Sequence, residues 1–300
     1  MKTKASREDG SAQAAPKRYR TESLISRDGT TISYRQIGHG PGLLLLHGGM
    51  SSAHNHMEMA EALSDAFTIY VPDRRGRCDS GPFGVDYCMR KEVEDVEALL
   101  TRTGAHYTFG VSSGALILLE ALLSHSCIRK AAVFEPPIFS DASVPAAVLA
   151  RLDNEMEQGN IAAALITAMK GARMGPAALR MVPRGLLKIL VKLAMKIEDR
   201  QTQGAYVPMR SLAATLHYDS QLVVEMSGDV ERFRAIQAEV LLLGGSKSPA
   251  YLKAALDGLE RVISPFKRIE FRGLDHAASW NSDRGGKPEP VVGALRQFFM

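Results

Sequence analysis

The sequence contains little cysteine, and its few cysteines form no pattern that metals or disulfides use. Cys78, Cys88 and Cys127 are widely spaced, with no C-x-x-C pair and no histidine at metal-ligand spacing. Three separate cysteines are typical of a protein whose thiols stay reduced in the cytosol. We therefore expect free thiols and no metal site.

An excess of one charge is also missing. Lysine and arginine number 37, aspartate and glutamate 33, and the two signs are interleaved, which leaves a formal net charge of +4. Such a mild balance does not indicate a nucleic-acid partner. No apolar run is long enough to cross a bilayer, and the first residues lack the apolar region of a secretory signal. We expect a cytoplasmic protein without a membrane span, and its oligomeric state stays open.

What the chain does have is 300 residues with 45% hydrophobic content, enough for one large core. Residues 1–18 are basic and polar and are expected to form a disordered arm. After them, short apolar runs alternate with helical patterns. This alternation is typical of an α/β fold with a mostly parallel sheet that helices cover on both faces.

The pattern predicts individual elements. Strands are expected at 43–47, 67–72, 107–111, 130–134, 239–243 and 267–271, and a hairpin at 23–37. Helices are expected to start after Ser51-Ser52 and run towards Ser64, and at 91–103, 115–123, 250–262 and 289–299. Between residues 146 and 237 strand character is scarce, while Ala, Leu, Met and Lys dominate. We interpret 138–237 as a helical cap inserted into a core of 19–137 and 238–300.

The pentapeptide Gly110-Val111-Ser112-Ser113-Gly114 has the form of a nucleophile elbow. A catalytic serine on a strand-to-helix turn adopts a strained backbone, which leaves room only for glycine two residues before and after it. Chance gives this pattern about 0.2 times in such a chain. The expected strand before it and helix after it carry the argument, and they predict Ser112 as a nucleophile.

Three further segments accompany the elbow: His47-Gly48-Gly49-Met50, Val71-Pro72-Asp73-Arg74-Arg75-Gly76 with Ser80-Gly81, and Gly273-Leu274-Asp275-His276. Taken in their order along the chain, the elbow and these three segments resemble the α/β-hydrolase family over nearly the whole chain. They match its oxyanion loop, the loop after its fourth strand, its elbow and its late histidine loop. The aspartate and arginines of the second segment are expected to order the loop beside the elbow.

The resemblance implies a role for each matched residue. A serine hydroxyl is a poor nucleophile at neutral pH, so His276 is expected to take the proton of Ser112 as general base. The backbone N–H groups of Ser113 and Gly49 are expected to bind the oxyanion, with Met50 as the alternative to Gly49. The other histidines are weaker candidates for the base: His39, His47, His54, His56, His106, His125 and His217.

The acid of the triad departs from the commonest family pattern. Many members carry an aspartate after the seventh strand, where this chain has Ser248. Some members, including fungal zearalenone lactonases, take the acid from the end of the sixth strand, which here places Glu135 in that role. Asp275 and Asp141 are the alternatives. If no carboxylate reaches the histidine, a weakened serine–histidine dyad remains.

The resemblance therefore implies a serine hydrolase that needs no cofactor or metal and forms an acyl-enzyme. An ester, thioester or lactone is the expected substrate, and the mostly apolar cap favours a hydrophobic small molecule over a sugar or a peptide. Haloalkane dehalogenase and epoxide hydrolase chemistry is disfavoured, since those relatives need aspartate where this chain has Ser112. Two alternatives stay open: carbon–carbon bond hydrolysis or acyl transfer with the same residues, and a non-catalytic ligand receptor on the same fold.

Overall fold

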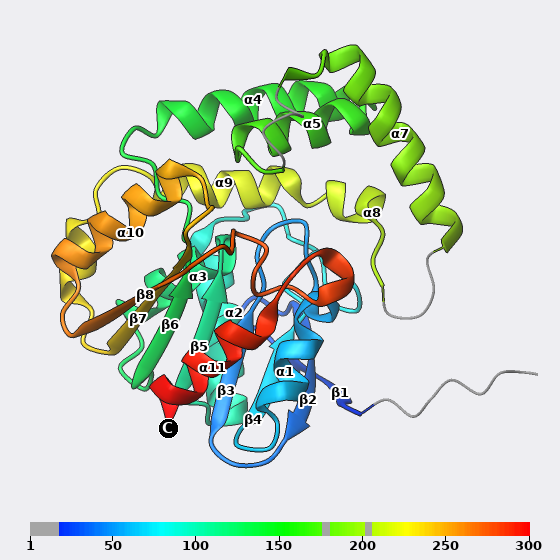
Figure 1. Cartoon of the computed structure of the whole chain (residues 1–300). Coiled ribbons are helices and arrows are strands. Elements are labelled where there is room, and N and C mark those ends of the chain that lie inside the picture. Colours follow the sequence, from blue (N-terminus) through cyan, green and yellow to red (C-terminus); the bar gives the residue numbers. More distant parts are fainter. Residues whose placement is uncertain (1–17, 176–180, 202–205) are drawn as a thin grey trace, which may run out of the picture.

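A computed structural model describes residues 18–175, 181–201 and 206–300 of the chain. Apart from Arg18, the arm predicted for residues 1–18 lies outside the described residues. At the centre is an eight-stranded sheet in the order β1-β2-β4-β3-β5-β6-β7-β8 (Figure 1). The strands are β1 (Arg20–Ile25), β2 (Thr31–Gly38), β3 (Gly42–Leu46), β4 (Thr68–Pro72), β5 (Tyr107–Val111), β6 (Lys130–Phe134), β7 (Glu239–Gly245) and β8 (Phe266–Phe271).

Strand direction follows from how the strands are connected. β1 and β2 form the predicted antiparallel hairpin, and β2 pairs antiparallel with β4. The strands from β3 to β8 pair in parallel, each reached through a crossover. The central strands are short and buried, whereas the edge strands β1 and β8 are largely exposed and polar. The mostly parallel α/β sheet predicted from the sequence is confirmed.

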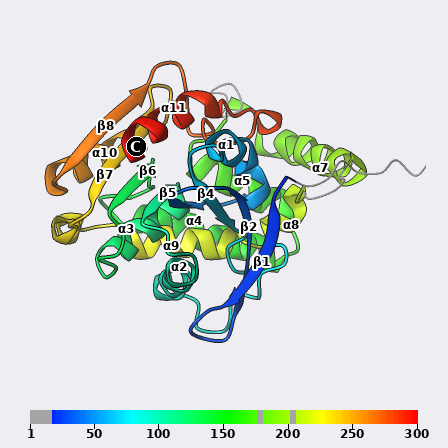
Figure 2. The same ribbon diagram turned by 90° about the horizontal axis from the view of Figure 1, so that it is seen from below.

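Helices cover both faces of the sheet (Figure 2). α1 (Met57–Leu63) and α11 (Pro288–Phe299) lie on one face, and α2 (Met89–Thr103), α3 (Ser113–Leu122) and α10 (Ala250–Val262) on the other. Alternate residues of one strand serve the two faces: Leu44 and Leu46 pack with α2 and α3, Leu43 and Leu45 with α1 and α11. This two-residue period is the geometry of a strand buried on both sides.

The helix predicted to start after Ser51-Ser52 and to run towards Ser64 differs in its first turn. A 3₁₀ turn, Ala53–His56, precedes α1. Two side chains hold that turn: the Asn55 amide oxygen accepts the N–H of Ser52 at 2.9 Å, and Asp73 accepts the N–H of Ala53 at 2.8 Å. The carboxylate of Asp73, in a distant loop, therefore sets the start of this segment. Hydrophobic periodicity cannot reveal a contact of this kind.

The segment between β6 and β7 contains helices and no strand among its described residues. We call α4 (Ser143–Glu157), α5 (Ile161–Gly171), α7 (Arg184–Gln201), α8 (Met209–Ala213) and α9 (Leu216–Met226) the cap helices. They lie over the carboxyl ends of the parallel strands (Figure 1). Met50, from the loop after β3, packs against their apolar cluster. The exact limits of a cap at residues 138 and 237 stay a prediction.

Candidate active site

Ser112 stands on a sharp turn between β5 and α3. Its backbone is strained, with φ 56° and ψ −124°, and its N–H donates to the Phe134 carbonyl at 2.9 Å. A Cβ on Gly110 would lie 2.6 Å from the Gly114 carbonyl oxygen, and one on Gly114 would lie 2.5 Å from that of Leu46. Both glycines are therefore required by close backbone contacts, which is the mechanical reason behind the pentapeptide.

Glu135 follows β6, the strand next to β5, so its position and that of Ser112 lie at the same edge of the sheet. Its side chain is fully buried and its φ is 48°. One carboxylate oxygen, Oε1, accepts the N–H of Gly245 at 2.6 Å, and the other, Oε2, lies 2.7 Å from Nδ1 of His276. A buried carboxylate is tolerated when hydrogen bonds replace its hydration, and these two contacts do so.

His276 reaches Glu135 because the loop after β8 folds back across the end of β7. The Lys247 N–H donates to the Leu274 carbonyl at 2.8 Å, and a Cβ on Gly245 would lie 2.4 Å from that same oxygen. Only glycine at position 245 permits this approach. The same glycine donates its N–H to Glu135, so a single residue fixes both the loop and the carboxylate.

The contact with Glu135 also determines which ring nitrogen of His276 carries the proton. An ionised carboxylate only accepts hydrogen bonds, so Nδ1 is assigned the proton and Nε2 keeps its lone pair. Within the described part of the chain, neither Nε2 nor the Ser112 hydroxyl has a hydrogen-bond partner. The structure thus joins His276 to Glu135 and does not join Ser112 to His276. Catalytic hydrogen bonds are often long until substrate binds.

The other positions considered for the acid lie elsewhere. The Ser248 hydroxyl is buried without a hydrogen-bond partner among the described residues. Asp275 and Asp141 are exposed, and each accepts the backbone N–H two residues further on, at 3.0 and 2.8 Å. Glu135 is the carboxylate that contacts His276.

The predicted oxyanion loop passes directly beside the elbow. A Cβ on Gly48 would lie 2.8 Å from Cβ of Ser112. Ser113 is the first residue of α3, so its N–H belongs to the group that a helix leaves unpaired at its N-terminus. In the described ranges, the N–H groups of Gly49, Met50 and Ser113 donate no hydrogen bond. These unpaired donors could bind a developing negative charge.

His47, at the start of this loop, is buried and has a structural contact on each ring nitrogen. Nδ1 lies 2.9 Å from the Gly48 carbonyl oxygen, and Nε2 accepts the N–H of Arg74 at 3.2 Å. Burial, reinforced by the nearby charges of Arg77 and Arg74, holds the pKa of His47 well below its usual value. These contacts assign the proton to Nδ1 and a lone pair to Nε2. The neutral His47 ring therefore fastens the oxyanion loop to the loop after β4, and it is not free to act as a base.

Beneath the cap helices, a buried ionic network surrounds the elbow. Asp219 of α9 accepts hydrogen bonds from Arg74 at 2.9 Å, Arg77 at 2.5 Å and the Ser113 hydroxyl at 3.0 Å. Arg74 also forms two bonds with Glu92, at 3.0 and 2.7 Å. Burial alone would raise the pKa of Asp219, but the two arginines outweigh it and lower that pKa. Two positive and two negative side chains balance in a region closed to water.

Asp219 also approaches the oxyanion loop, because a Cβ on Gly49 would lie 3.2 Å from its Oδ2. The sequence interpretation assigned Arg74 and Arg75 to loop ordering and missed both Arg77 and Asp219. A signal was present: in α9 the buried positions are Leu216, Asp219, Leu222 and Met226, a helical stripe with one carboxylate in it. A carboxylate is seldom buried unless it is paired.

Asp219→Ala is expected to lower the free energy of unfolding by about 3–5 kcal/mol, since it leaves two buried guanidinium groups without their shared partner. Chemical denaturation of the variant and the wild-type protein measures this difference. Glu157→Ala, an exposed acid of cap helix α4, is the matched control and should change stability by less than about 0.5 kcal/mol. A loss below about 1 kcal/mol for Asp219→Ala would contradict the role given to the network.

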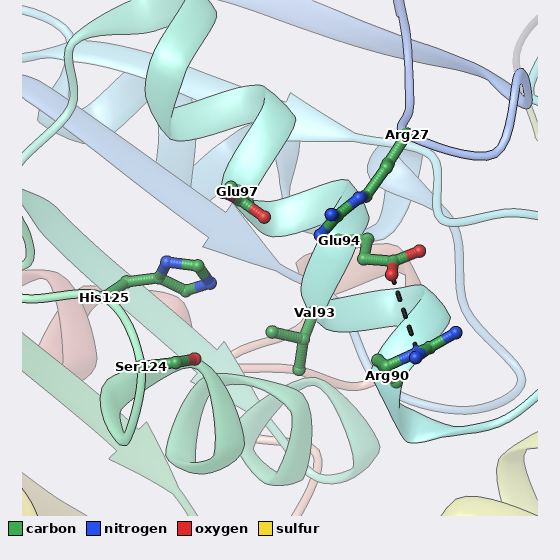
Figure 3. A pocket seen from close by; sticks show the side chains of 7 residues that line it. All are labelled: Arg27, Arg90, Val93, Glu94, Glu97, Ser124 and His125. Carbon is green, nitrogen blue, oxygen red and sulfur yellow. Dashed lines mark ion pairs between the residues drawn. The ribbon is translucent and has the colours of Figure 1, made fainter.

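One cavity of about 380 Å³ lies away from these residues (Figure 3). It is lined by Arg27, Arg90, Val93, Glu94, Glu97, Ser124 and His125. Its lining comes from the turn after β1, from α2 and from the residues that follow the C-terminal end of α3, whereas Ser112 precedes the N-terminal end of α3. Arg90 and Glu94 form an ion pair of 3.5 Å within it. Of the residues considered for the site, only His125, a weaker candidate for the base, lines this cavity.

Neither a metal-binding cluster nor a membrane-spanning helix occurs in the described ranges. No group of three or more histidine, cysteine, aspartate or glutamate side chains there could hold a metal ion. Within the same ranges, no helix combines the length and the apolar character needed to span a bilayer.

Comparison with known proteins adds independent findings. A model of the alpha/beta hydrolase family matches residues 43–293. The uncharacterized hydrolase YraK of Bacillus subtilis (strain 168) is 34% identical over 101 residues, which are 32% of this chain and 37% of that relative. The match therefore spans little more than a third of YraK.

Solved structures resemble the chain over most of its length. An alpha/beta hydrolase from Sphaerobacter thermophilus DSM 20745 is 29% identical with a TM-score of 0.75, covering 93% of this chain and 100% of that one. The enol-lactonase from Burkholderia xenovorans LB400 is 16% identical with a TM-score of 0.66, covering 93% and 99%. At that lower identity the second likeness concerns the fold alone.

Proposed function

This chain belongs to the alpha/beta hydrolase family, and we propose that it is a serine hydrolase that cleaves an ester, thioester or lactone of a hydrophobic small molecule. The observation that carries the proposal is the 2.7 Å contact between His276 Nδ1 and the buried carboxylate of Glu135. A buried acid that orients an imidazole, at the strand edge where Ser112 stands on its strained turn, supports nucleophilic catalysis.

In the proposed reaction, His276 Nε2 removes the proton of Ser112 as the serine oxygen attacks the acyl carbon. The imidazolium that forms is stabilised by the negative charge of Glu135. General base catalysis of this kind contributes about 10² to 10⁴-fold. The proton then passes from His276 to the leaving oxygen or sulfur, and an acyl-enzyme remains on Ser112. Water activated by the same imidazole hydrolyses the acyl-enzyme and restores the serine.

The tetrahedral intermediates carry a negative oxygen that needs donors already in place. We assign these donors to the N–H of Ser113 and the N–H of Gly49, with Met50 as the alternative to Gly49. Each such donor contributes about 3–4 kcal/mol to transition-state stabilisation. Because Asp219 bonds the Ser113 hydroxyl and lies against Gly49, the ionic network supports both proposed donors.

A hydrophobic substrate is supported by the side chains that the cap helices bring to the oxyanion loop. Met50 packs against the apolar cluster of the cap, as do the partly buried Met156 and Met209. Thioether side chains adapt to apolar ligands of varied shape. One structural relative is an enol-lactonase, so lactones belong among the substrates to be tested.

The proposal is tested with a fluorophosphonate probe and a panel of nitrophenyl esters and lactones of short, medium and long acyl chains. We expect covalent labelling of the peptide that contains Ser112, and turnover that disappears in proportion to the labelled fraction. Heat-denatured protein is the control for non-specific labelling. Absence of both labelling and turnover would overturn the proposal and favour a non-catalytic ligand receptor.

A further inference from the structure

Helix α7 presents an apolar stripe to solvent. Five of its large apolar side chains are exposed: Leu186 (50%), Ile189 (64%), Leu190 (46%), Leu193 (54%) and Ile197 (45%). Their spacing of three or four residues places them on one side of the helix, within about 100° of arc. We call these five residues the α7 stripe. Met181, 88% exposed, precedes the helix.

The cap does not need this stripe for its own packing. The opposite side of α7 carries Leu187 and Met195, which are 2% and 3% exposed, and Met195 and Val191 pack in the apolar cluster of the cap helices. The helix is therefore apolar on two faces, and one of them is covered. A contiguous exposed apolar face of this kind marks an interaction surface.

Positive charge accompanies the stripe. Lys192 and Lys196 lie along one of its flanks by helical spacing, and within the described ranges neither lysine forms an ion pair. The acids of the helix are at its C-terminal end and have basic or polar partners: Asp199 pairs with Arg210 at 3.2 Å, and Glu198 accepts the Met209 N–H at 2.8 Å. The flank of the stripe is therefore positive and its charge is not neutralised.

The position of α7 allows a flat surface to reach the stripe. In Figure 1 the helix forms the outer edge of the cap, far from the sheet, and Figure 2 shows it extending beyond the core from the second direction. A partner at the stripe would not have to displace any core element.

We propose that the α7 stripe docks the protein on an anionic lipid surface. An amphipathic helix in the plane of a membrane buries an apolar face at the acyl boundary, while lysines at its margin bind anionic headgroups. The stripe and its flanking lysines have both features. This inference goes beyond the proposed hydrolase activity and does not depend on it.

A second copy of the chain packed antiparallel fits the stripe less well. Two antiparallel α7 helices related by a two-fold axis bring the same flank of each helix together. Lys192 and Lys196 would then face the lysine-bearing flank of the other copy, and like charges in that position repel. An anionic surface turns the same lysines into a favourable contribution.

The test is co-sedimentation of the full chain with phosphatidylcholine vesicles and with vesicles that also contain phosphatidylglycerol. We expect at least about tenfold stronger binding to the anionic vesicles, weakened by added salt. The double variant Ile189→Glu with Leu193→Glu should reduce binding at least about tenfold, and each of Lys192→Gln and Lys196→Gln about fivefold. Val144→Glu, a 50% exposed valine of α4, is the matched control and should bind as the wild-type protein does.

Thermal unfolding identifies any variant that fails to fold, and the basic arm is kept in every variant. Wild-type binding by the folded Glu double variant would overturn the proposal, because another part of the chain would then hold the vesicles. Absence of binding by the wild-type protein would overturn it as well. A lipid-free dimer that dissociates in the double variant would assign the stripe to a second copy instead.

Discussion

Ser112→Ala is expected to lower kcat/KM for every ester or lactone substrate by about 10⁴ to 10⁶-fold while the protein stays folded. The elbow supplies the reason: strain at a φ of 56° and the close contacts of Gly110 and Gly114 serve to expose one hydroxyl at the end of β5. Alanine keeps the backbone and removes the nucleophile. Kinetics on the best substrate of the panel, together with loss of fluorophosphonate labelling, measure the effect.

Ser113→Ala separates the nucleophile from its neighbour. This variant removes a hydroxyl that bonds Asp219 at 3.0 Å but keeps the backbone N–H proposed for the oxyanion hole. It should keep covalent labelling and lose far less activity than Ser112→Ala. Labelling that persists in Ser112→Ala, or turnover within about tenfold of the wild-type protein, would exclude the proposed acyl-enzyme.

Much of the fold could be predicted because its strands carry strong local patterns. The range of β6, Lys130–Phe134, and that of α10, Ala250–Val262, agree with the predicted ranges residue for residue. β6 is a short apolar run buried on both faces, and α10 has a clear amphipathic period and a proline before it. In such segments the local pattern and the tertiary environment favour the same conformation.

The features that sequence reasoning missed depend on contacts between distant residues. Asp73 determines the 3₁₀ turn before α1, and Asp219 gathers two arginines from a loop more than a hundred residues earlier. A buried ion pair has no periodicity of its own. The exposed stripe of α7 was likewise hidden, because its apolar residues could equally have faced the core.

The residues of the candidate site also differ in how far local sequence predicts them. Ser112 was identifiable from the elbow, because its glycines are required by contacts within a few residues and with β3. The acid was assigned to Glu135 only through the family resemblance, since local pattern does not distinguish Glu135, Asp275 and Asp141, which are all carboxylates in loops. What distinguishes Glu135 is the N–H of Gly245 at the end of β7 and the return of the loop after β8, both remote in the sequence.

That arrangement makes Glu135→Gln the sharpest test of the proposed acid, and we expect it to lower kcat by about 10⁴-fold. The Gly245 N–H donates to Oε1 of Glu135 at 2.6 Å and needs an acceptor in the variant as well. The amide oxygen of glutamine should therefore take the Oε1 position. Its NH₂ group then faces Nδ1 of His276, where the carboxylate now lies at 2.7 Å. An NH₂ donor forces Nδ1 to accept, which moves the ring proton to Nε2.

With a proton on Nε2, His276 cannot take the proton of Ser112, and no negative charge remains to stabilise an imidazolium. Asp275→Asn makes the same chemical change beside His276 on an exposed side chain and should leave kcat within about twofold of the wild-type value. Glu135→Asp keeps the charge but shortens the side chain, so it cannot hold Gly245 and His276 together and should give an intermediate rate. Wild-type turnover by a folded Glu135→Gln protein would mean that catalysis does not use this carboxylate, whatever its contact with the imidazole.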